Sequence, residues 1–124
     1  MPDRVRILVA DRNVLVIEAL EDLFVELNGG VQVLKAGSLQ ETLTIAERDQ
    51  PELILIDAWI GTDAEQTIRQ VVEVSPRSAV YVTATNCDPD FELRVLRAGA
   101  KGCCEKEQIP ARARSLVDAA RANQ

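Results

Sequence analysis

Five short aliphatic runs, each followed by a segment of helical period, constrain the fold of this chain more than any other feature. The runs are VRILVA (5–10), VQVLKA (31–36), ELILID (52–57), AVYVTA (79–84) and KGCCEK (101–106). The first and third are almost continuously aliphatic, which is typical of strands that are covered on both faces. The segments between the runs repeat apolar residues at i, i+3 and i+4 spacing, which predicts amphipathic helices.

Capping residues and prolines predict where the helices begin and end. The expected helix starts are Asn13, the capping-box patterns SLQE (38–41) and TDAE (62–65), Asp88-Pro89 and Pro110. The expected ends are Asn28-Gly29-Gly30, Pro51, Ser75-Pro76 and Gly99. Each predicted helix therefore fits between two predicted strands with only short connections.

Alternating strands and helices with brief connections indicate a parallel sheet, because parallel strands need crossovers and helices must cover both faces. We therefore expect an α/β fold: a single doubly wound, flavodoxin-like domain with five helices. Right-handed crossovers leave few strand orders, and 2-1-3-4-5 is the commonest for five strands. In that order the first and third strands flank the switch point, where ligands bind beyond the carboxyl ends.

Charge and composition exclude several classes of protein. The chain has 124 residues, enough for one domain, and a formal net charge of −6, which argues against direct nucleic-acid binding. No apolar run approaches the roughly 20 residues of a membrane span, and no signal peptide is evident. We therefore expect a soluble cytoplasmic protein. The chain has no histidine, which removes Ser-His-Asp and Cys-His catalysis and the usual zinc sites.

The three cysteines, Cys87, Cys103 and Cys104, form neither an even disulfide set nor a C-x-x-C metal motif. We expect them to be small, buried or partly buried thiols in a reducing compartment. A redox pair of Cys103 with Cys104 is disfavoured, because neighbouring strand residues point to opposite faces and a bridge would be strained.

Four chemically active residues fall at the carboxyl ends of predicted strands. The first strand ends at Asp11, the third at Asp57, the fourth carries Thr83 and the fifth ends at Lys106. Taken singly, each is more often a helix cap or a solvated charge. Together on one sheet edge, two carboxylates, a hydroxyl and an ammonium predict a functional site.

These residues carry a family resemblance. RILVAD (6–11), PELILID (51–57), VYVTA (80–84) and LRAGAKGCCEK (96–106) resemble the receiver domain of bacterial two-component response regulators, over about residues 4–122. The resemblance implies a CheY-like fold and a phosphorelay role, with Asp57 as phosphoacceptor and no enzyme activity beyond autocatalytic phosphotransfer onto Asp57. It further implies Mg²⁺ held by Asp11, Asp57 and the Trp59 carbonyl, and phosphoryl contacts from Lys106 and Thr83.

The chain departs from the family pattern at three places. Arg12 stands where a second acidic residue is usual, IGT (60–62) replaces Met-Pro-Gly, and Cys103 replaces an aromatic residue. Arg12 either forks onto Asp11 or Asp57 in place of a metal or swings outward into water. An inward guanidinium would repel Mg²⁺. The alternative function is therefore a pseudo-receiver, a binding or dimerisation module that acts without phosphorylation.

The resemblance also implies partners. They are a sensor histidine kinase or a phosphotransfer protein, and a possible homodimer through the fourth helix, fifth strand and fifth helix, around residues 88–122. Trp59 either packs in its loop, shields the acceptor or contacts a partner. A haloacid-dehalogenase-type phosphatase would need Asp-x-Asp, and neither DRN (11–13) nor DAW (57–59) has it.

Overall fold

The computed structural model describes residues 4–27 and 30–123 and shows one five-stranded parallel sheet. The strand order is β2-β1-β3-β4-β5, which confirms the predicted order. The strands are β1 (Val5–Ala10), β2 (Val31–Ala36), β3 (Leu53–Asp57), β4 (Ala79–Ala84) and β5 (Gly102–Glu105). β3 begins one residue later than predicted, and β5 is one residue shorter at each end.

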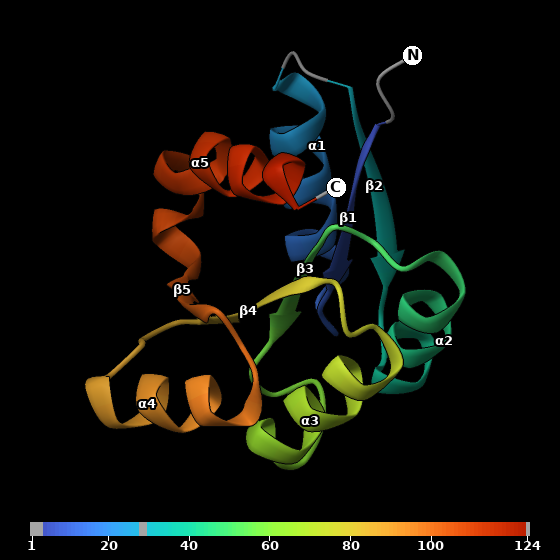
Figure 1. The fold of residues 1–124 in the computed structure, drawn as a ribbon. Helices are drawn as coiled ribbons and strands as arrows, with labels where there is room; N and C mark the ends of the chain where they lie inside the picture. Colours follow the sequence, from blue (N-terminus) through green and yellow to red (C-terminus); the bar gives the residue numbers. More distant parts are fainter. Residues whose placement is uncertain (1–3, 28–29, 124) are drawn as a thin grey trace.

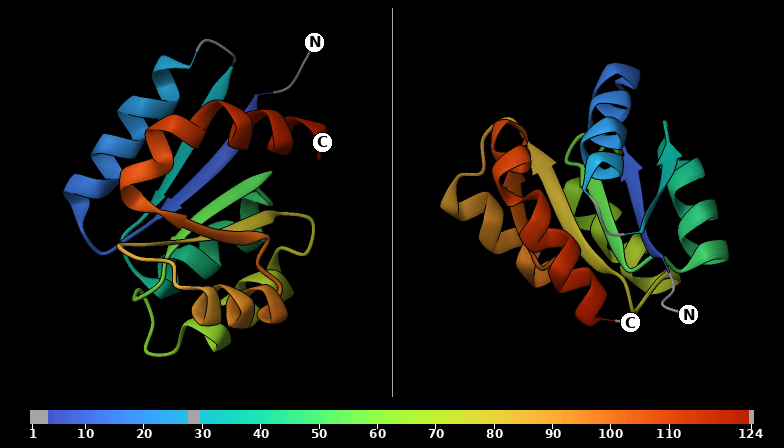
Figure 2. Two further views of the ribbon diagram at one scale, coloured as in Figure 1. Left: turned by 90° about the vertical axis from the view of Figure 1, so that its left-hand side faces the viewer. Right: turned by 90° about the horizontal axis from the view of Figure 1, so that it is seen from above.

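Helices cover both faces of the sheet (Figures 1 and 2), as the aliphatic strands require. They are α1 (Val14–Glu26), α2 (Leu39–Asp49), α3 (Ala64–Val74), α4 (Pro89–Ala98) and α5 (Ile109–Ala122). α1 and α5 pack on one face, and α2, α3 and α4 pack on the other. A short 3₁₀ turn, Lys106–Gln108, joins β5 to α5.

Two apolar clusters make the core, one on each face of the sheet. On the α1–α5 face, Phe24 is fully buried against alternate residues of β1 and β3 and against α5. On the other face, Ile68 and Val71 of α3 and Val95 of α4 pack against the remaining strand residues. Alternation along each strand therefore decides which cluster a side chain joins.

The helix starts follow the predicted residues with two corrections: α5 begins at Ile109, one residue before the predicted Pro110, and the N-cap of α3 differs. Asn13, Ser38 and Asp88 accept hydrogen bonds from first-turn backbone N–H groups of α1, α2 and α4. The N-cap of α3 is Asp63, not Thr62 of the predicted capping box. The Asp63 carboxylate accepts from two backbone N–H groups, of Glu65 and Gln66, which a single Thr62 cap would not match.

α1 ends at Glu26, with Leu27 as its C-cap, before the predicted end at Asn28-Gly29-Gly30, of which Asn28 and Gly29 lie outside the described residues. α3 ends at Val74 with Ser75 as its C-cap, as predicted, and α4 is capped by Gly99. Gly99 has φ 118°, a left-handed conformation that favours glycine.

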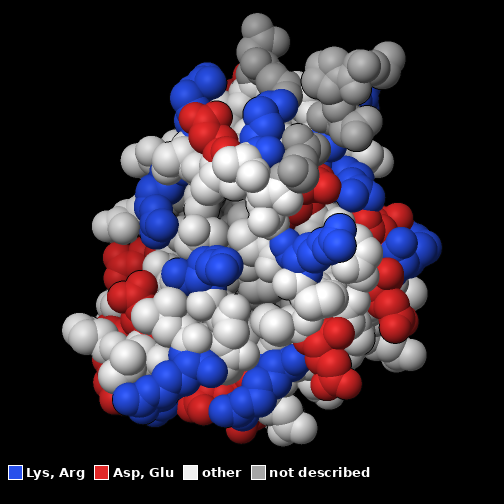
Figure 3. Space-filling view, viewed as in Figure 1, with Lys and Arg blue, Asp and Glu red and all other residues white. Residues whose placement is uncertain are grey.

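Charged side chains of both signs are interspersed on the face seen in Figure 3. The described residues of that face therefore form no continuous basic surface of the kind that follows a phosphate backbone. Within residues 4–27 and 30–123, no helix is both long enough and apolar enough to traverse a bilayer.

Candidate functional site at the carboxyl edge of the sheet

The structure brings all four predicted site residues to the same sheet edge. Asp11 directly follows β1, Asp57 is the last residue of β3, Thr83 lies near the end of β4, and Lys106 directly follows β5. Asp57 and Thr83 are direct neighbours in the sheet register. Asp11, Asp57 and Thr83 are only 4%, 9% and 3% exposed, so the strands hold these polar groups where they are largely shielded from solvent.

Lys106 bridges the two carboxylates. Its Nζ lies 2.9 Å from Asp11 Oδ2 and 2.8 Å from Asp57 Oδ1. Burial lowers the pKa of Lys106, but its hydrogen bonds to Asp57 and Asp11 and their charges outweigh burial, so its pKa is raised. The ammonium therefore stays charged at neutral pH, and one positive charge is shared by two negative ones.

The second oxygen of each carboxylate is held by the backbone. The Trp59 N–H donates to Asp57 Oδ2 over 3.1 Å, and the Asn13 N–H donates to Asp11 Oδ1 over 2.8 Å. These bonds are local, because each joins residues two positions apart. They fix the orientation of each carboxylate relative to the space beyond the strand ends.

Arg12 takes neither of the two predicted orientations, and the expected fork onto Asp11 or Asp57 is wrong for this structure. Its Nη2 donates to the Ile60 carbonyl over 3.2 Å, and the ion pairs among the described residues give it no carboxylate. The side chain is exposed but is not simply free in water. Lys106 occupies the bridging position, because its long flexible stem reaches both carboxylates from the end of β5, past the end of β4.

The Thr83 hydroxyl forms no hydrogen bond with any other described residue, although Thr83 is buried. In the described part of the chain, no fully buried polar side-chain atom lacks a partner. The hydroxyl must therefore be reachable from outside, and it remains free to donate to a group placed beside Asp57.

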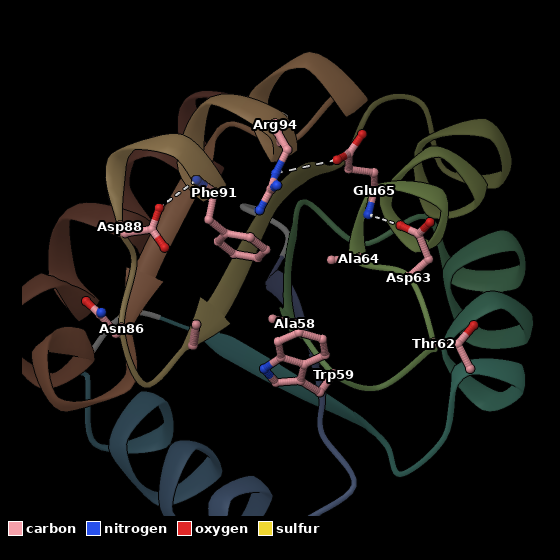
Figure 4. Close-up of a pocket in the computed structure, with 11 residues that line it drawn as sticks. Ala58, Trp59, Thr62, Asp63, Ala64, Glu65, Asn86, Asp88, Phe91 and Arg94 are labelled. Carbon is pink, nitrogen blue, oxygen red and sulfur yellow. Dashed lines mark hydrogen bonds and ion pairs between the residues drawn. The ribbon is translucent and has the colours of Figure 1, made fainter.

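Trp59 is 68% exposed, which contradicts the interpretation that it simply packs into its loop. It lines a pocket of about 430 Å³ together with Ala58, the residue that follows Asp57 (Figure 4). Asn86 and Asp88 of the β4–α4 loop and Phe91 of α4 line the same pocket. Arg94 and Glu65 form an ion pair at its far side, with 3.6 Å between Nε and Oε1.

Gly61 sets the path of the β3–α3 loop that carries Trp59 and Ile60. A Cβ at Gly61 would meet the Thr67 hydroxyl, with Leu39 Cδ2 3.2 Å away. The backbone therefore passes close against α3 at this point. This close approach places the Ile60 carbonyl where Arg12 reaches it.

The cysteines differ from the prediction that all three are thiols. Cys87 and Cys103 form a disulfide, with their Cα atoms 5.9 Å apart, and Cys104 is a buried free cysteine. Cys103 and Cys104 lie in the two different core clusters, so the expected opposite orientation is confirmed. The strand order places Cys87 after β4 and Cys103 on the adjacent β5, but it does not show which way the loop after β4 turns.

The site has oxygen donors of the kind that Mg²⁺ prefers, in the two carboxylates and the nearby backbone carbonyls. Among the described residues, no group of three or more His, Cys, Asp or Glu is placed to hold a metal ion. Two carboxylates completed by backbone and water oxygens still fit Mg²⁺, because this ion usually keeps several waters.

Comparison with known proteins gives two curated relatives, while no family model matches the chain. The chain is 31% identical over 104 residues to the response regulator GacA of Pseudomonas viridiflava, a match covering 82% of this chain and 48% of GacA. It is 23% identical over 121 residues to the uncharacterized transcriptional regulatory protein YxjL of Bacillus subtilis (strain 168), covering 97% of this chain and 54% of YxjL. The chain thus spans about half the length of these relatives.

Among solved structures, a signal receiver domain from Mycobacterium tuberculosis superposes with a TM-score of 0.85. The two chains are 24% identical, and the match covers 97% of this chain and 98% of the other. This likeness establishes that the fold is shared over nearly the whole chain.

Proposed function

The chain belongs to the response regulator receiver domains of the CheY-like fold, not to a family of classical enzymes, and from this premise we propose that Asp57 accepts a phosphoryl group. The supporting observation is the Lys106 ammonium, which lies 2.8 Å from Asp57 Oδ1 and 2.9 Å from Asp11 Oδ2. The proposed receiver domain covers residues 4–122, with its acceptor at the switch point between β1 and β3.

The donor in this proposal is a phosphohistidine of a sensor histidine kinase or a phosphotransfer protein. A carboxylate oxygen of Asp57 attacks phosphorus, a new O–P bond forms, and the N–P bond to the donor histidine breaks. Lys106 neutralises charge on the phosphoryl oxygens, and the free Thr83 hydroxyl donates a hydrogen bond to one of them. Such transfer depends mainly on positioning and charge stabilisation.

Asp11, Asp57 and the Trp59 backbone carbonyl would hold Mg²⁺ in this function. When bound, the ion neutralises charge on the oxygens of the transferring group. The chain's own contribution is to hold both carboxylates by their backbone hydrogen bonds from Asn13 and Trp59.

Arg12 departs from the family's second acidic residue, and we propose that it weakens Mg²⁺ binding without filling the site. Its guanidinium is anchored on the Ile60 carbonyl, to one side of the carboxylate pair. Replacing Arg12 by Asp changes the charge by two units. If each unit acts on the doubly charged ion over about 8 Å, it contributes about 1 kcal/mol in a water-like dielectric. Two units then contribute about 2 kcal/mol, so Mg²⁺ affinity should rise about thirtyfold.

Titration of Trp59 fluorescence with Mg²⁺ in the parent and in Arg12→Asp measures this change. Arg77→Asp is the matched control, because it makes the same charge change in the loop before β4, at the opposite edge of the sheet. Equal affinities in the parent and Arg12→Asp would show that Arg12 has no influence on the metal.

The proposed output surface is formed by α4, β5 and α5. Leu93 and Leu96 of α4 are exposed apolar residues, which supports a partner or a second copy of this chain on that face. The kinase partner implies a cytoplasmic location. Sedimentation of the parent and of Leu93→Glu, before and after phosphorylation, tests for a dimer, which the charged variant should lose.

Intact mass after incubation with Mg²⁺ and acetyl phosphate tests phosphorylation itself. The parent should gain one phosphoryl mass and Asp57→Asn should gain none. Asp63→Asn is a control variant, because Asp63 is a nearby carboxylate that only caps α3. A folded parent that gains no mass would support the second candidate, a module that binds or dimerises without phosphorylation. The presence of Arg12 where the family usually has a second acidic residue favours this candidate.

A further inference from the structure

The disulfide ties the loop after β4 to the neighbouring edge strand. Cys87 lies in the β4–α4 loop, residues 85–88, and Cys103 lies in β5. Cys87 is partly buried between exposed neighbours, whereas Cys103 is only 6% exposed. A small reagent can therefore reach the sulfur of Cys87 first. The more deeply buried Cys103 is then placed to attack the modified Cys87 sulfur.

One carboxylate ties the loop to β5, and a second ties α4, which follows the loop, to β5, both without using sulfur. Glu105 Oε2 accepts from the Cys87 N–H over 3.0 Å, and Glu92 Oε2 accepts from the Cys103 N–H over 3.3 Å. The Cα separation of 5.9 Å also lies within the range that a disulfide spans. The two sulfurs therefore stay neighbours when the bond is broken, which is what a reversible pair requires.

We propose that Cys87 and Cys103 are a redox modification site, which a low-molecular-weight disulfide of the glutathione class closes and a thiol of the same class opens. The Cys87 thiolate attacks the small disulfide, forms a mixed disulfide and releases one small thiol. The Cys103 thiolate then attacks the Cys87 sulfur and releases the second. The protein loses two protons and two electrons, and the small disulfide is reduced to two thiols.

Cys104 provides an internal comparison, because it adjoins Cys103 in sequence but points to the other face of the sheet. It is fully buried, and burial raises the pKa of its thiol. Cys104 should therefore stay reduced and unreactive in the folded protein while the other two cysteines exchange.

Closing the pair restrains one wall of the pocket beside the acceptor. The loop begins two residues after Thr83, and Asn86 and Asp88 flank Cys87 in the pocket wall opposite Trp59 (Figure 4). A restrained loop limits how far Thr83 can move toward a group on Asp57. This consequence rests on the proposed function, and it makes oxidation and phosphorylation antagonistic, each weakening the other.

Thiol counting tests the redox site without reference to phosphorylation. The protein is equilibrated at a series of glutathione to glutathione-disulfide ratios, quenched with acid, unfolded, alkylated and weighed. As the buffer becomes more reducing, the number of free thiols should rise from one to three in the parent and from none to two in Cys104→Ser. Both proteins should make this change at the same ratio of glutathione to glutathione disulfide. Cys87→Ser and Cys103→Ser should form no intramolecular bond. Three free thiols at every ratio, or a bond that survives the most reducing buffer, would overturn the proposal.

Hydrogen exchange tests the restraint on the loop. Peptides covering residues 84–92 should exchange about tenfold more slowly in the oxidised protein, with β1 peptides unchanged. Equal exchange rates in the two forms would show that the disulfide does not restrain the loop.

The rate of phosphorylation tests the antagonism. Acetyl phosphate should label oxidised Cys104→Ser about fivefold more slowly than reduced Cys104→Ser. Equal labelling rates would overturn the antagonism. If neither form is labelled, the proposed function fails, while the thiol count and the exchange rates still decide the redox site.

Discussion

The two ends of the sheet both carry a charge cluster, but the clusters are composed differently. At the amino end, Arg6 of β1 pairs with Glu52, with 3.0 Å between Nη2 and Oε2, and the Arg6 backbone N–H donates to Glu52 Oε1 over 2.7 Å. The Arg6 guanidinium also donates to the Asp49 and Gln50 carbonyls. At the carboxyl end, two carboxylates share the single ammonium of Lys106.

The difference separates a structural cluster from a functional one. Among the described residues, the Arg6 cation pairs with the Glu52 anion at the amino end, and further hydrogen bonds of Arg6 run to backbone groups that hold β1 beside the α2–β3 connection. The carboxyl end keeps an excess negative charge and the unpartnered Thr83 hydroxyl. An unbalanced, incompletely hydrogen-bonded site costs stability and leaves interactions available to a ligand.

The largest effect should come from the disulfide, which restrains the carboxyl end. Reduction should lower the free energy of unfolding by about 3 kcal/mol, because the bond closes a loop between residues 16 positions apart. Urea unfolding with and without reductant measures the loss. Cys87→Ser should behave like the reduced parent in both buffers, and Cys104→Ser should keep the response. A loss below about 1 kcal/mol would mean that the hydrogen bonds of Glu105 and Glu92 alone hold the loop and α4 against β5.

Glu52→Gln should lower the free energy of unfolding by about 2 kcal/mol, because it removes a negative charge that accepts two hydrogen bonds from Arg6 at the amino end of the sheet. Burial raises the pKa of Glu52, but Arg6 outweighs burial and the net pKa is lowered. A lowered carboxyl pKa contributes stability above its ordinary pKa of about 4.3, and the contribution is lost as the pH falls through the folded value. Unfolding between pH 7 and pH 3 should show this loss in the parent and not in Glu52→Gln.

Asp57→Asn should have the opposite effect from Glu52→Gln and raise the free energy of unfolding by about 1 kcal/mol. The reason is that it leaves Lys106 with one carboxylate and removes the repulsion between Asp11 and Asp57. The same removal of one negative charge thus destabilises one end of the sheet and stabilises the other. Thermal or urea unfolding of both variants provides the test. Destabilisation of Asp57→Asn would show that the carboxyl end is a balanced structural cluster after all.

The smallest effect should be the alkaline dependence of Lys106. Its pKa is raised, so its contribution to stability is present below its ordinary pKa of about 10.4 and is lost as the pH rises through the higher folded value. Because the ammonium is partly exposed, the loss should stay below about 1 kcal/mol. Unfolding from pH 8 to pH 11 should show it in the parent and in Lys101→Met, an exposed control, and not in Lys106→Met.

Most of the framework was predictable because it depends on repeated local patterns. The aliphatic runs predicted β1, β2 and β4 at their observed bounds, and right-handed crossovers left few strand orders. The convergence of Asp11, Asp57, Thr83 and Lys106 followed from that order alone. Side-chain direction did not follow, because Arg12 and Lys106 have long flexible stems and either could have bridged the carboxylates.

The cysteine pairing was missed for a related reason. Cys87 lies beyond the end of β4 in an irregular loop, and sequence spacing does not say which way such a loop turns. The hydrogen bonds from Cys87 to Glu105 and from Cys103 to Glu92 set that direction, and they join residues 18 and 11 positions apart. Contacts of this kind become visible only once the strands are placed.

The tight passage at Gly61 has a consequence for how the site could diversify. In a saturation library across residues 59–62, position 61 should return glycine almost alone, since any larger residue displaces Thr67. The exposed positions 59 and 62 should accept many residues. New specificities are therefore accessible by exchanging side chains along the pocket rim, but not by rerouting the loop, unless a smaller residue replaces Thr67 at the same time.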